Sequence, residues 1–292
     1  MLHRIRLLGL DLDGTLLNNE KQLSKINEDS IKEIMKKGVV VVPVTGRPKK
    51  GIPDAILKLF HSSYIITSNG AVTTDIKPQK DIEGVYLSNQ TVIDIFTVIQ
   101  KINEKVEFEV FVDGMGYAQK HQFYIVKEKY RGTPLESYIQ NSRSPVDDIN
   151  NFIASRKDNI AGISIMTDSI AIKNKILNVL TEFRNIKTTS SVPTDLEINA
   201  VNAGKGLALL SLAKRLGIQK SEIMACGDSE NDIEMLKMVE IGVAMSNSDE
   251  RVKAIADYIT LSNEENGVAY AIDRFIRCQP PLILTEVLQQ KI

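Results

Sequence analysis

Residues 7–17 read LLGLDLDGTLL, an apolar run that ends in two aspartates, Asp11 and Asp13. The run predicts a buried strand, and the glycine and threonine that follow predict a turn. Side chains alternate along a strand, so Asp11 and Asp13 share one side while Leu12 points to the other. Two converging carboxylates raise each other's pKa unless a cation lies between them. The sequence therefore predicts a bound cation or acid–base chemistry at this strand end.

Similar short apolar segments alternate with helical patterns in the first and last thirds of the chain. VVVVPV at 39–44 is β-branched, as a strand buried on both faces requires, and YIIT at 64–67 is a third short strand. Ser24 is a candidate cap for the helix between the first two strands, and 205–217 forms an amphipathic helix with a glycine stop. Strands separated by helices of this length predict an α/β fold with a parallel sheet.

The middle of the chain has a different pattern. Two polar stretches, at 75–84 and 188–197, bracket a segment with alternating, antiparallel-like strands such as EFEVFVDGMGYAQK. This change predicts a second α/β domain inserted into the first. We expect residues 1–81 and 190–292 to form the core domain and residues 82–189 to form the inserted one.

Small polar residues and glycine follow four of the predicted strands. They are Asp11 to Thr15, Thr45-Gly46-Arg47, Ser68-Asn69-Gly70 and Gly227-Asp228 with Ser229 to Asp232. Each alone is an ordinary turn, but ligands of parallel sheets bind where strands reach their carboxyl ends. Competing motifs fail on spacing, since neither the calcium loop of an EF-hand nor a Walker A phosphate loop fits the chain. The four strand ends together predict one ligand site.

Composition excludes several classes of protein. The formal net charge is −1 with scattered basic residues, so we expect no nucleic-acid partner, and no apolar run is long enough to cross a membrane. Two cysteines make no disulfide framework, which favours a reducing cytoplasm. The three histidines are widely spaced, which argues against a histidine-dependent hydrolase. We expect a monomer or weak homodimer that acts on a small molecule.

The combination of motifs resembles the haloacid dehalogenase (HAD) superfamily. The matching features are D-x-D-G-T-L after the first strand, T-G-R after the second, a lysine that opens a helix, and G-D-x-x-N-D after a late strand. The segments SNGAV, GVAM, ADYIT and NGVAYAI further resemble its Cof-type (subfamily IIB) sugar-phosphatase branch. The resemblance implies a Rossmann-like core with an inserted α/β cap of the C2 type, and a Mg²⁺-dependent phosphatase that hydrolyses small phosphomonoesters.

The resemblance also implies roles for individual residues. Asp11 is the expected nucleophile, which forms an aspartyl-phosphate. Asp13 is the expected acid for the leaving alcohol and the base for the hydrolytic water. Asp11, the backbone carbonyl of Asp13, and Asp228 are the expected Mg²⁺ ligands.

Thr45 and Lys205 are expected to hold the phosphoryl group, with backbone N–H groups of Leu12 and Gly46 and the amide of Asn231 as further donors. Asp232 is expected to support the metal ligands. Two alternatives stay open for Arg47, which contacts either the substrate or an acidic neighbour, and Asn69 has similar standing. The sequence also leaves open a phosphomutase or phosphotransferase, and a non-catalytic sensor of phosphorylated metabolites.

Overall fold

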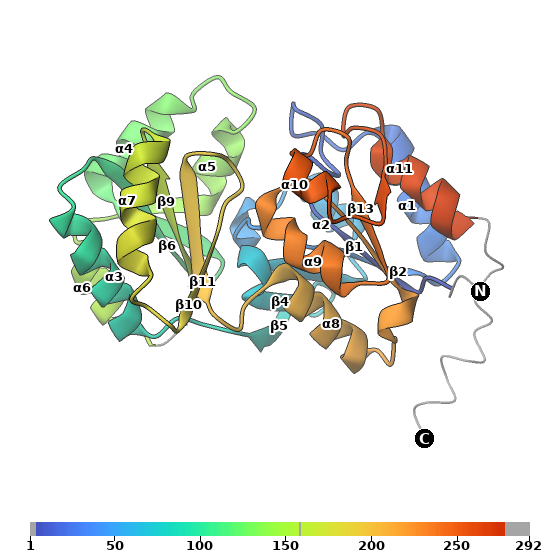
Figure 1. The fold of residues 1–292 in the computed structure, drawn as a ribbon, viewed down its shortest axis with the longest axis horizontal. Coiled ribbons are helices and arrows are strands. Elements are labelled where there is room, and N and C mark those ends of the chain that lie inside the picture. Colours follow the sequence, from blue (N-terminus) through green and yellow to red (C-terminus); the bar gives the residue numbers. More distant parts are fainter. Residues whose placement is uncertain (1–3, 158, 278–292) are drawn as a thin grey trace.

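The computed structural model describes residues 4–157 and 159–277, and the predicted tail after Cys278 lies outside them. The chain forms two lobes that face each other (Figure 1). The first and last described residues, Arg4 and Arg277, belong to the lobe that holds the five-stranded sheet, and the other lobe is built from the middle of the sequence. The fold is the α/β architecture that the sequence predicts, with a parallel core sheet and an inserted cap.

The core sheet is entirely parallel, with the strand order β14-β13-β12-β1-β2. Its strands are β1 (Leu7–Leu10), β2 (Val40–Pro43), β12 (Ile223–Gly227), β13 (Ile241–Ala244) and β14 (Tyr258–Ile259). Pro43, which lacks an N–H, is the last residue of β2 at the edge of this sheet.

Helices cover both faces of the core sheet. One face packs against α1 (Lys25–Lys36), α2 (Asp54–Leu59) and α11 (Gly267–Ile272), which runs into a π-helical turn, η5 (Asp273–Arg277). The other packs against α8 (Lys205–Arg215), α9 (Ile233–Met238) and α10 (Glu250–Lys253). Gly9 allows the close approach of α8, because a Cβ there would lie 2.6 Å from a methyl carbon of Leu209. Cys226 is fully buried in this core, and burial raises its pKa to about 12, so it packs as an apolar side chain.

The segment YIIT departs from the predicted parallel sheet. It forms β3 (Tyr64–Thr67), which pairs antiparallel with β4 (Val72–Asp75), and β4 pairs with β5 (Lys80–Gly84). A single parallel bridge between Val44 and Ile66 joins this small sheet to the end of β2. After Pro48 the chain makes the 3₁₀ turn η1 (Lys49–Gly51), and Pro53 then starts α2.

The cap contains a six-stranded mixed sheet with the order β10-β11-β9-β6-β7-β8. Its strands are β6 (Val106–Val112), β7 (Met115–Gln119), β8 (Arg143–Val146), β9 (Ile160–Thr167), β10 (Ile186–Thr189) and β11 (Asp195–Ala200). One face shares an apolar core with α3 (Asn89–Lys101), α6 (Ile149–Ala154) and α7 (Ile170–Leu180). The helices α4 (Lys120–Lys129) and α5 (Glu136–Ser142) complete the lobe.

The strand bounds correct both ends expected for the inserted segment. The predicted start, at 82, falls inside β5, and the predicted end, at 189, separates β10 from β11. Yet β11 pairs with both β10 and β9, so the cap sheet continues to Ala200. The polar composition of 188–197 predicts a domain boundary, but Ser191, Asp195 and Glu197 are polar because they face a pocket.

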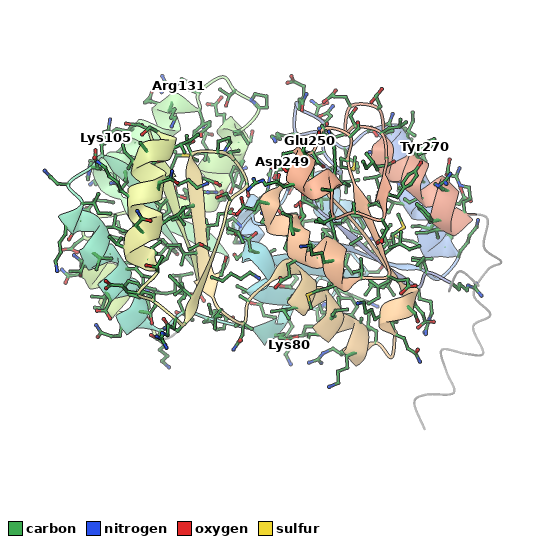
Figure 2. All side chains as sticks on the ribbon, viewed as in Figure 1. Lys80, Lys105, Arg131, Asp249, Glu250 and Tyr270 are labelled. Carbon is green, nitrogen blue, oxygen red and sulfur yellow. The ribbon has the colours of Figure 1, made fainter. Side chains whose placement is uncertain are left out.

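Charged side chains of both signs are spread over the two lobes (Figure 2). Lys105 and Arg131, for example, lie on one lobe, and Asp249 and Glu250 lie on the other. Among the described residues, no helix has the length and apolarity needed to cross a bilayer.

Ser24 caps α1 as the sequence predicts, with its side chain accepting a hydrogen bond from the Asn27 N–H. We expect Ser24→Ala to lower the free energy of unfolding by about 1 kcal/mol, because the N–H loses its acceptor. Urea unfolding followed by circular dichroism measures this. Ser24→Asp keeps a capping oxygen and should retain wild-type stability; an equal loss in both variants would show that the cap is not the cause.

Candidate active site

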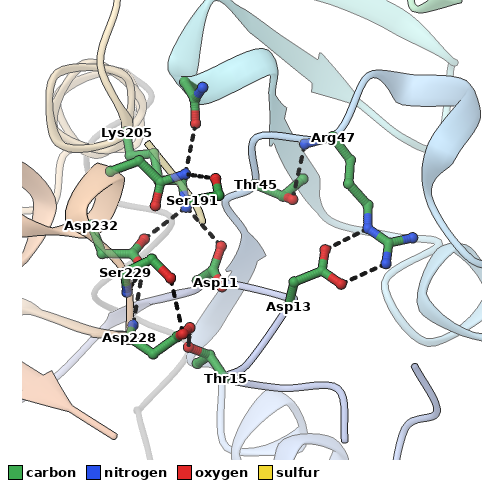
Figure 3. A network of polar contacts seen from close by, with 12 residues as sticks. Asp11, Asp13, Thr15, Thr45, Arg47, Ser191, Lys205, Asp228, Ser229 and Asp232 are labelled. Carbon is green, nitrogen blue, oxygen red and sulfur yellow. Dashed lines mark hydrogen bonds and ion pairs between the residues drawn. The ribbon is translucent and has the colours of Figure 1, made fainter. Parts of the chain in front are cut away.

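The carboxyl ends of β1, β2 and β12 lie next to one another in the core sheet, and the polar residues that follow them gather at this edge (Figure 3). Asp11 and Asp13 both line a pocket of about 380 Å³ between the core and the cap, whereas Leu12 is fully buried in the core. The alternation predicted for this strand end is thus present. Five further predicted site residues line the same pocket: Thr45, Gly46, Arg47, Asp228 and Asn231.

Lys205, the first residue of α8, is a buried cation between two carboxylates. Its Nζ lies 2.7 Å from an oxygen of Asp11 and 2.7 Å from an oxygen of Asp232, and the side chain is 1% exposed. Burial alone would lower the pKa of Lys205, but the charges of Asp11 and Asp232 raise it above its ordinary value. The lysine is therefore charged, and it fixes the position of Asp11.

Three carboxylates share this site with one lysine. Oxygens of Asp11, Asp228 and Asp232 all lie within 4.8 Å of one another. Burial and the charge of Asp232 raise the pKa of Asp11 well above its ordinary value, and the same two causes raise that of Asp228 to about 6. Burial contributes most to these shifts, and the repulsion between the carboxylates adds to it, so a further positive charge would stabilise the ionised cluster. Oxygen donors with surplus negative charge fit a hard divalent cation.

The two outer aspartates of this cluster are held by different partners. Asp228 accepts hydrogen bonds from the hydroxyls of Thr15 (2.7 Å) and Ser229 (3.0 Å). One oxygen of Asp232 contacts Lys205. The other oxygen accepts hydrogen bonds from the backbone N–H groups of Asp228 and Ser229, both at 3.0 Å. Both oxygens of Asp232 are thus occupied, which suits a residue that shapes the loop around Asp228.

Gly14 is required at this turn. Its φ is +80°, and a Cβ would lie 2.4 Å from an oxygen of Asp228. The glycine therefore lets the chain turn back after β1 while Asp228 remains beside it.

Asp13 is paired with cations instead of joining the carboxylate cluster. Arg47 binds it through two hydrogen bonds of 2.6 Å, and Lys21 lies 2.9 Å away. Burial would raise the pKa of Asp13, but the bonds and charge of Arg47, aided by Lys21, lower it to about 2. Of the two alternatives for Arg47, this structure shows the acidic neighbour. Lys21 was not predicted, since it belongs to no motif and comes to the site through a left-handed backbone (φ +60°).

Within the residues that the structure describes, some of the predicted phosphate donors are unpaired, and others already form hydrogen bonds. The backbone N–H groups of Leu12 and Gly46 donate to no other residue within 4–157 and 159–277. Thr45 is buried and accepts the Arg47 N–H at 3.2 Å. The Asn231 amide nitrogen instead donates to Asn69 (3.1 Å) and to the cap residue Ser191 (3.0 Å).

Contacts between the lobes close the pocket. Asn69 of the core donates to Glu197 of the cap at 3.1 Å, beside the Asn231–Ser191 bond. On the opposite side the Arg47 guanidinium lies 4.5 Å from the ring centre of Tyr138 in α5. Sequence reasoning missed the cap residues Ser191, Glu197 and Tyr138, because they belong to no shared motif.

The sequence and fold match known proteins over most of their length. The family model for haloacid dehalogenase-like hydrolases matches residues 8–272. A Bacillus subtilis protein named 5-amino-6-(5-phospho-D-ribitylamino)uracil phosphatase YcsE is 33% identical over 93% of this chain and 96% of its own. Phosphatase YwpJ of the same organism is 30% identical over 93% and 100%.

Among solved structures, a haloacid dehalogenase-like hydrolase from B. subtilis superposes with a TM-score of 0.82 at 26% identity, covering 93% of this chain and all of the other. One from Bacteroides thetaiotaomicron gives a TM-score of 0.77 at 26% identity, with coverages of 93% and 99%. The similarity spans core and cap alike. The chain therefore belongs to the haloacid dehalogenase-like hydrolases and is a phosphatase.

Proposed function

We propose that the protein is a Mg²⁺-dependent phosphatase that hydrolyses a small hydroxylated phosphomonoester through a phosphoryl group carried on Asp11. The observation that carries this proposal is the cluster of Asp11, Asp228 and Asp232 around the single cation Lys205 at the floor of the pocket. The substrate class rests on relatives of this chain, including the 33% identical one named for a ribityl phosphate compound.

Asp11 is placed to attack phosphorus. Lys205 holds one of its oxygens at 2.7 Å, which leaves the other to face the pocket that Asp11 lines. A carboxylate and a phosphate dianion repel each other by roughly 4 kcal/mol per unit pair at 4 Å and an effective dielectric of 20. Asp11, Asp228 and the backbone carbonyl of Asp13 would hold Mg²⁺, which supplies positive charge that offsets this repulsion.

The remaining residues bind the phosphoryl group and move protons. The free N–H groups of Leu12 and Gly46, with the Thr45 hydroxyl and Lys205, offer donors to the phosphoryl oxygens. Asp13 gives a proton to the leaving alcohol and later takes one from the attacking water. Arg47 binds both oxygens of Asp13 and keeps its pKa at about 2. This role therefore requires the guanidinium to release one oxygen when substrate enters, so that Asp13 takes up a proton before it gives one to the leaving alcohol.

We expect Asp11→Asn to lower kcat for phosphate release by at least about 10³-fold, because the neutral amide is no nucleophile. Phosphate release from a panel of sugar phosphates measures this. Asp168→Asn, on an exposed turn of the cap, is the matched control and should keep wild-type activity. Near-wild-type turnover by a folded Asp11→Asn protein would refute the nucleophile assignment.

We expect a chelator to remove activity and added Mg²⁺ to restore it, because the carboxylate cluster lacks a counter-charge without the ion. Asp228→Asn should raise the Mg²⁺ concentration for half-maximal activity by about tenfold or more. Titration of activity with Mg²⁺ for this variant and for Asp168→Asn makes the comparison. Full activity in the chelated protein would contradict a metal-dependent reaction.

We expect Asp13→Asn to slow hydrolysis of an alkyl phosphate at least about tenfold more than hydrolysis of p-nitrophenyl phosphate. The p-nitrophenolate leaves without a proton, whereas an alkoxide needs one. Single-turnover rates for the two substrates test this difference. An equal effect on both would assign Asp13 a role other than protonating the leaving group.

Product analysis separates hydrolysis from phosphoryl transfer to a second hydroxyl. Incubation with a hexose phosphate should yield inorganic phosphate and free hexose in equal amounts. An isomeric hexose phosphate as the main product would show a mutase instead.

A further inference from the structure

The face of the cap sheet that lines the pocket is rich in carboxylates. Three neighbouring strands, β11, β9 and β6, carry it, and they lie side by side in Figure 1. Their cross-strand partners form two rows that also line the pocket: Glu197–Ser164–Glu109 and Asp195–Met166–Glu107. We call these six residues the acidic face.

Alternation along the strands separates this face from the apolar core of the cap. Phe108 and Val110 flank Glu109 in β6 and are buried in that core, as are Ile163 and Ile165 beside Ser164 in β9. Glu107 and Glu109 follow each other on this face of β6, as Asp195 and Glu197 do on β11, with the uncharged residues of β9 between them. Burying carboxylates is costly. Glu109 and Asp195 are nevertheless only 8% and 6% exposed. Packing alone therefore gives no reason for acids at these positions.

Existing cations compensate only part of the acidic face. Glu109 is paired with Arg143 at 3.0 Å in a buried contact, and Arg143 also stacks on Tyr138. Glu107 has Lys129 at 3.5 Å. Neither Asp195 nor Glu197 forms an ion pair with another residue in the described part of the chain. Their bonds come from neutral donors: backbone N–H groups of Ser191 and Val192 for Asp195, and the Ser191 hydroxyl and two asparagine amides for Glu197.

The pocket as a whole keeps a surplus of negative charge. Seven carboxylates line it, against three cationic side chains, Lys21, Arg47 and Arg143. Each of the three is already paired with a carboxylate, Lys21 and Arg47 with Asp13 and Arg143 with Glu109. In about 380 Å³, a second anionic group on the substrate would thus meet several carboxylates that have no ion-pair partner, and among the described lining residues no cation that is not already paired.

From this arrangement, and resting on the proposed phosphatase function, we infer that the acidic face selects the leaving group. It accepts hydroxyl and ammonium donors and rejects a second anion, whether carboxylate or phosphate. Carboxylates accept hydrogen bonds from hydroxyls and ammonium groups. Like charges brought together in a desolvated pocket oppose binding and give specificity against the wrong partner.

Three substrates of similar size test this inference: glucose 6-phosphate, glucosamine 6-phosphate and 6-phosphogluconate. We expect kcat/KM for 6-phosphogluconate to be at least about tenfold below that for glucose 6-phosphate. The kcat/KM for glucosamine 6-phosphate should equal or exceed that for glucose 6-phosphate. The double variant Asp195→Asn with Glu107→Gln keeps the shape of one row but removes its charge. In this double variant, kcat/KM for 6-phosphogluconate should come to within about threefold of kcat/KM for glucose 6-phosphate.

Glu182→Gln, at an exposed position outside the acidic face, is the matched control and should leave the discrimination unchanged. Calorimetric titration of the Asp11→Asn protein with the same compounds, in the presence of Mg²⁺, compares their affinities without turnover. Discrimination in binding with no turnover by the wild-type protein would support the inference and refute the phosphatase function. Equal use, or equal binding, of 6-phosphogluconate and glucose 6-phosphate would overturn the inference.

Discussion

The buried ammonium of Lys205 is the interaction on which the rest of the site depends. It lies between Asp11 and Asp232, at the first residue of a helix that packs on the core sheet. One positive charge cannot balance the three carboxylates gathered here, and this imbalance is what makes the site suitable for a divalent cation and a phosphate. The parallel sheet supplies the geometry, because the ends of adjacent strands bring distant residues to one edge.

Electrostatics also organises the space above that edge. On the core side, Asp13 is held by Arg47 and Lys21, so the cations of the pocket are engaged before any substrate arrives. On the cap side, the acidic face presents carboxylates from strands that are apolar on their other side. A phosphate therefore finds its donors at the floor, while the leaving group meets hydrogen-bond acceptors. This division assigns reaction to the core and specificity to the cap.

Most of the core and its site could be predicted from the sequence, and most of the cap site could not. The apolar strands that lead to Asp11, Thr45 and Asp228 can be recognised in the sequence, because a strand, a polar residue and a turn follow one another in each case. This order predicts a site at the strand ends. The cap side of the pocket has no such order. Glu107 and Glu109 alternate with apolar residues, which predicts a strand with one polar face but does not predict that this face lines the pocket. Asp195 and Glu197 belong to the polar stretch that predicts a domain boundary, although they lie on a strand of the cap sheet. Lys21 and Tyr138 reach the site through backbone turns and lobe packing that depend on the whole fold.

The central claim is that Asp11 carries the phosphoryl group, and peptide mapping of an acid-quenched reaction tests it most directly. The Asp13→Asn protein, in which the second step is slowed, is mixed with Mg²⁺ and p-nitrophenyl phosphate, whose leaving group needs no proton. The reaction is quenched in acid and digested for mass spectrometry. The account predicts a phosphoryl group on the peptide that contains Asp11, lost on treatment with hydroxylamine. A phosphoryl group on another residue, or product formed while every peptide stays unmodified, would contradict it.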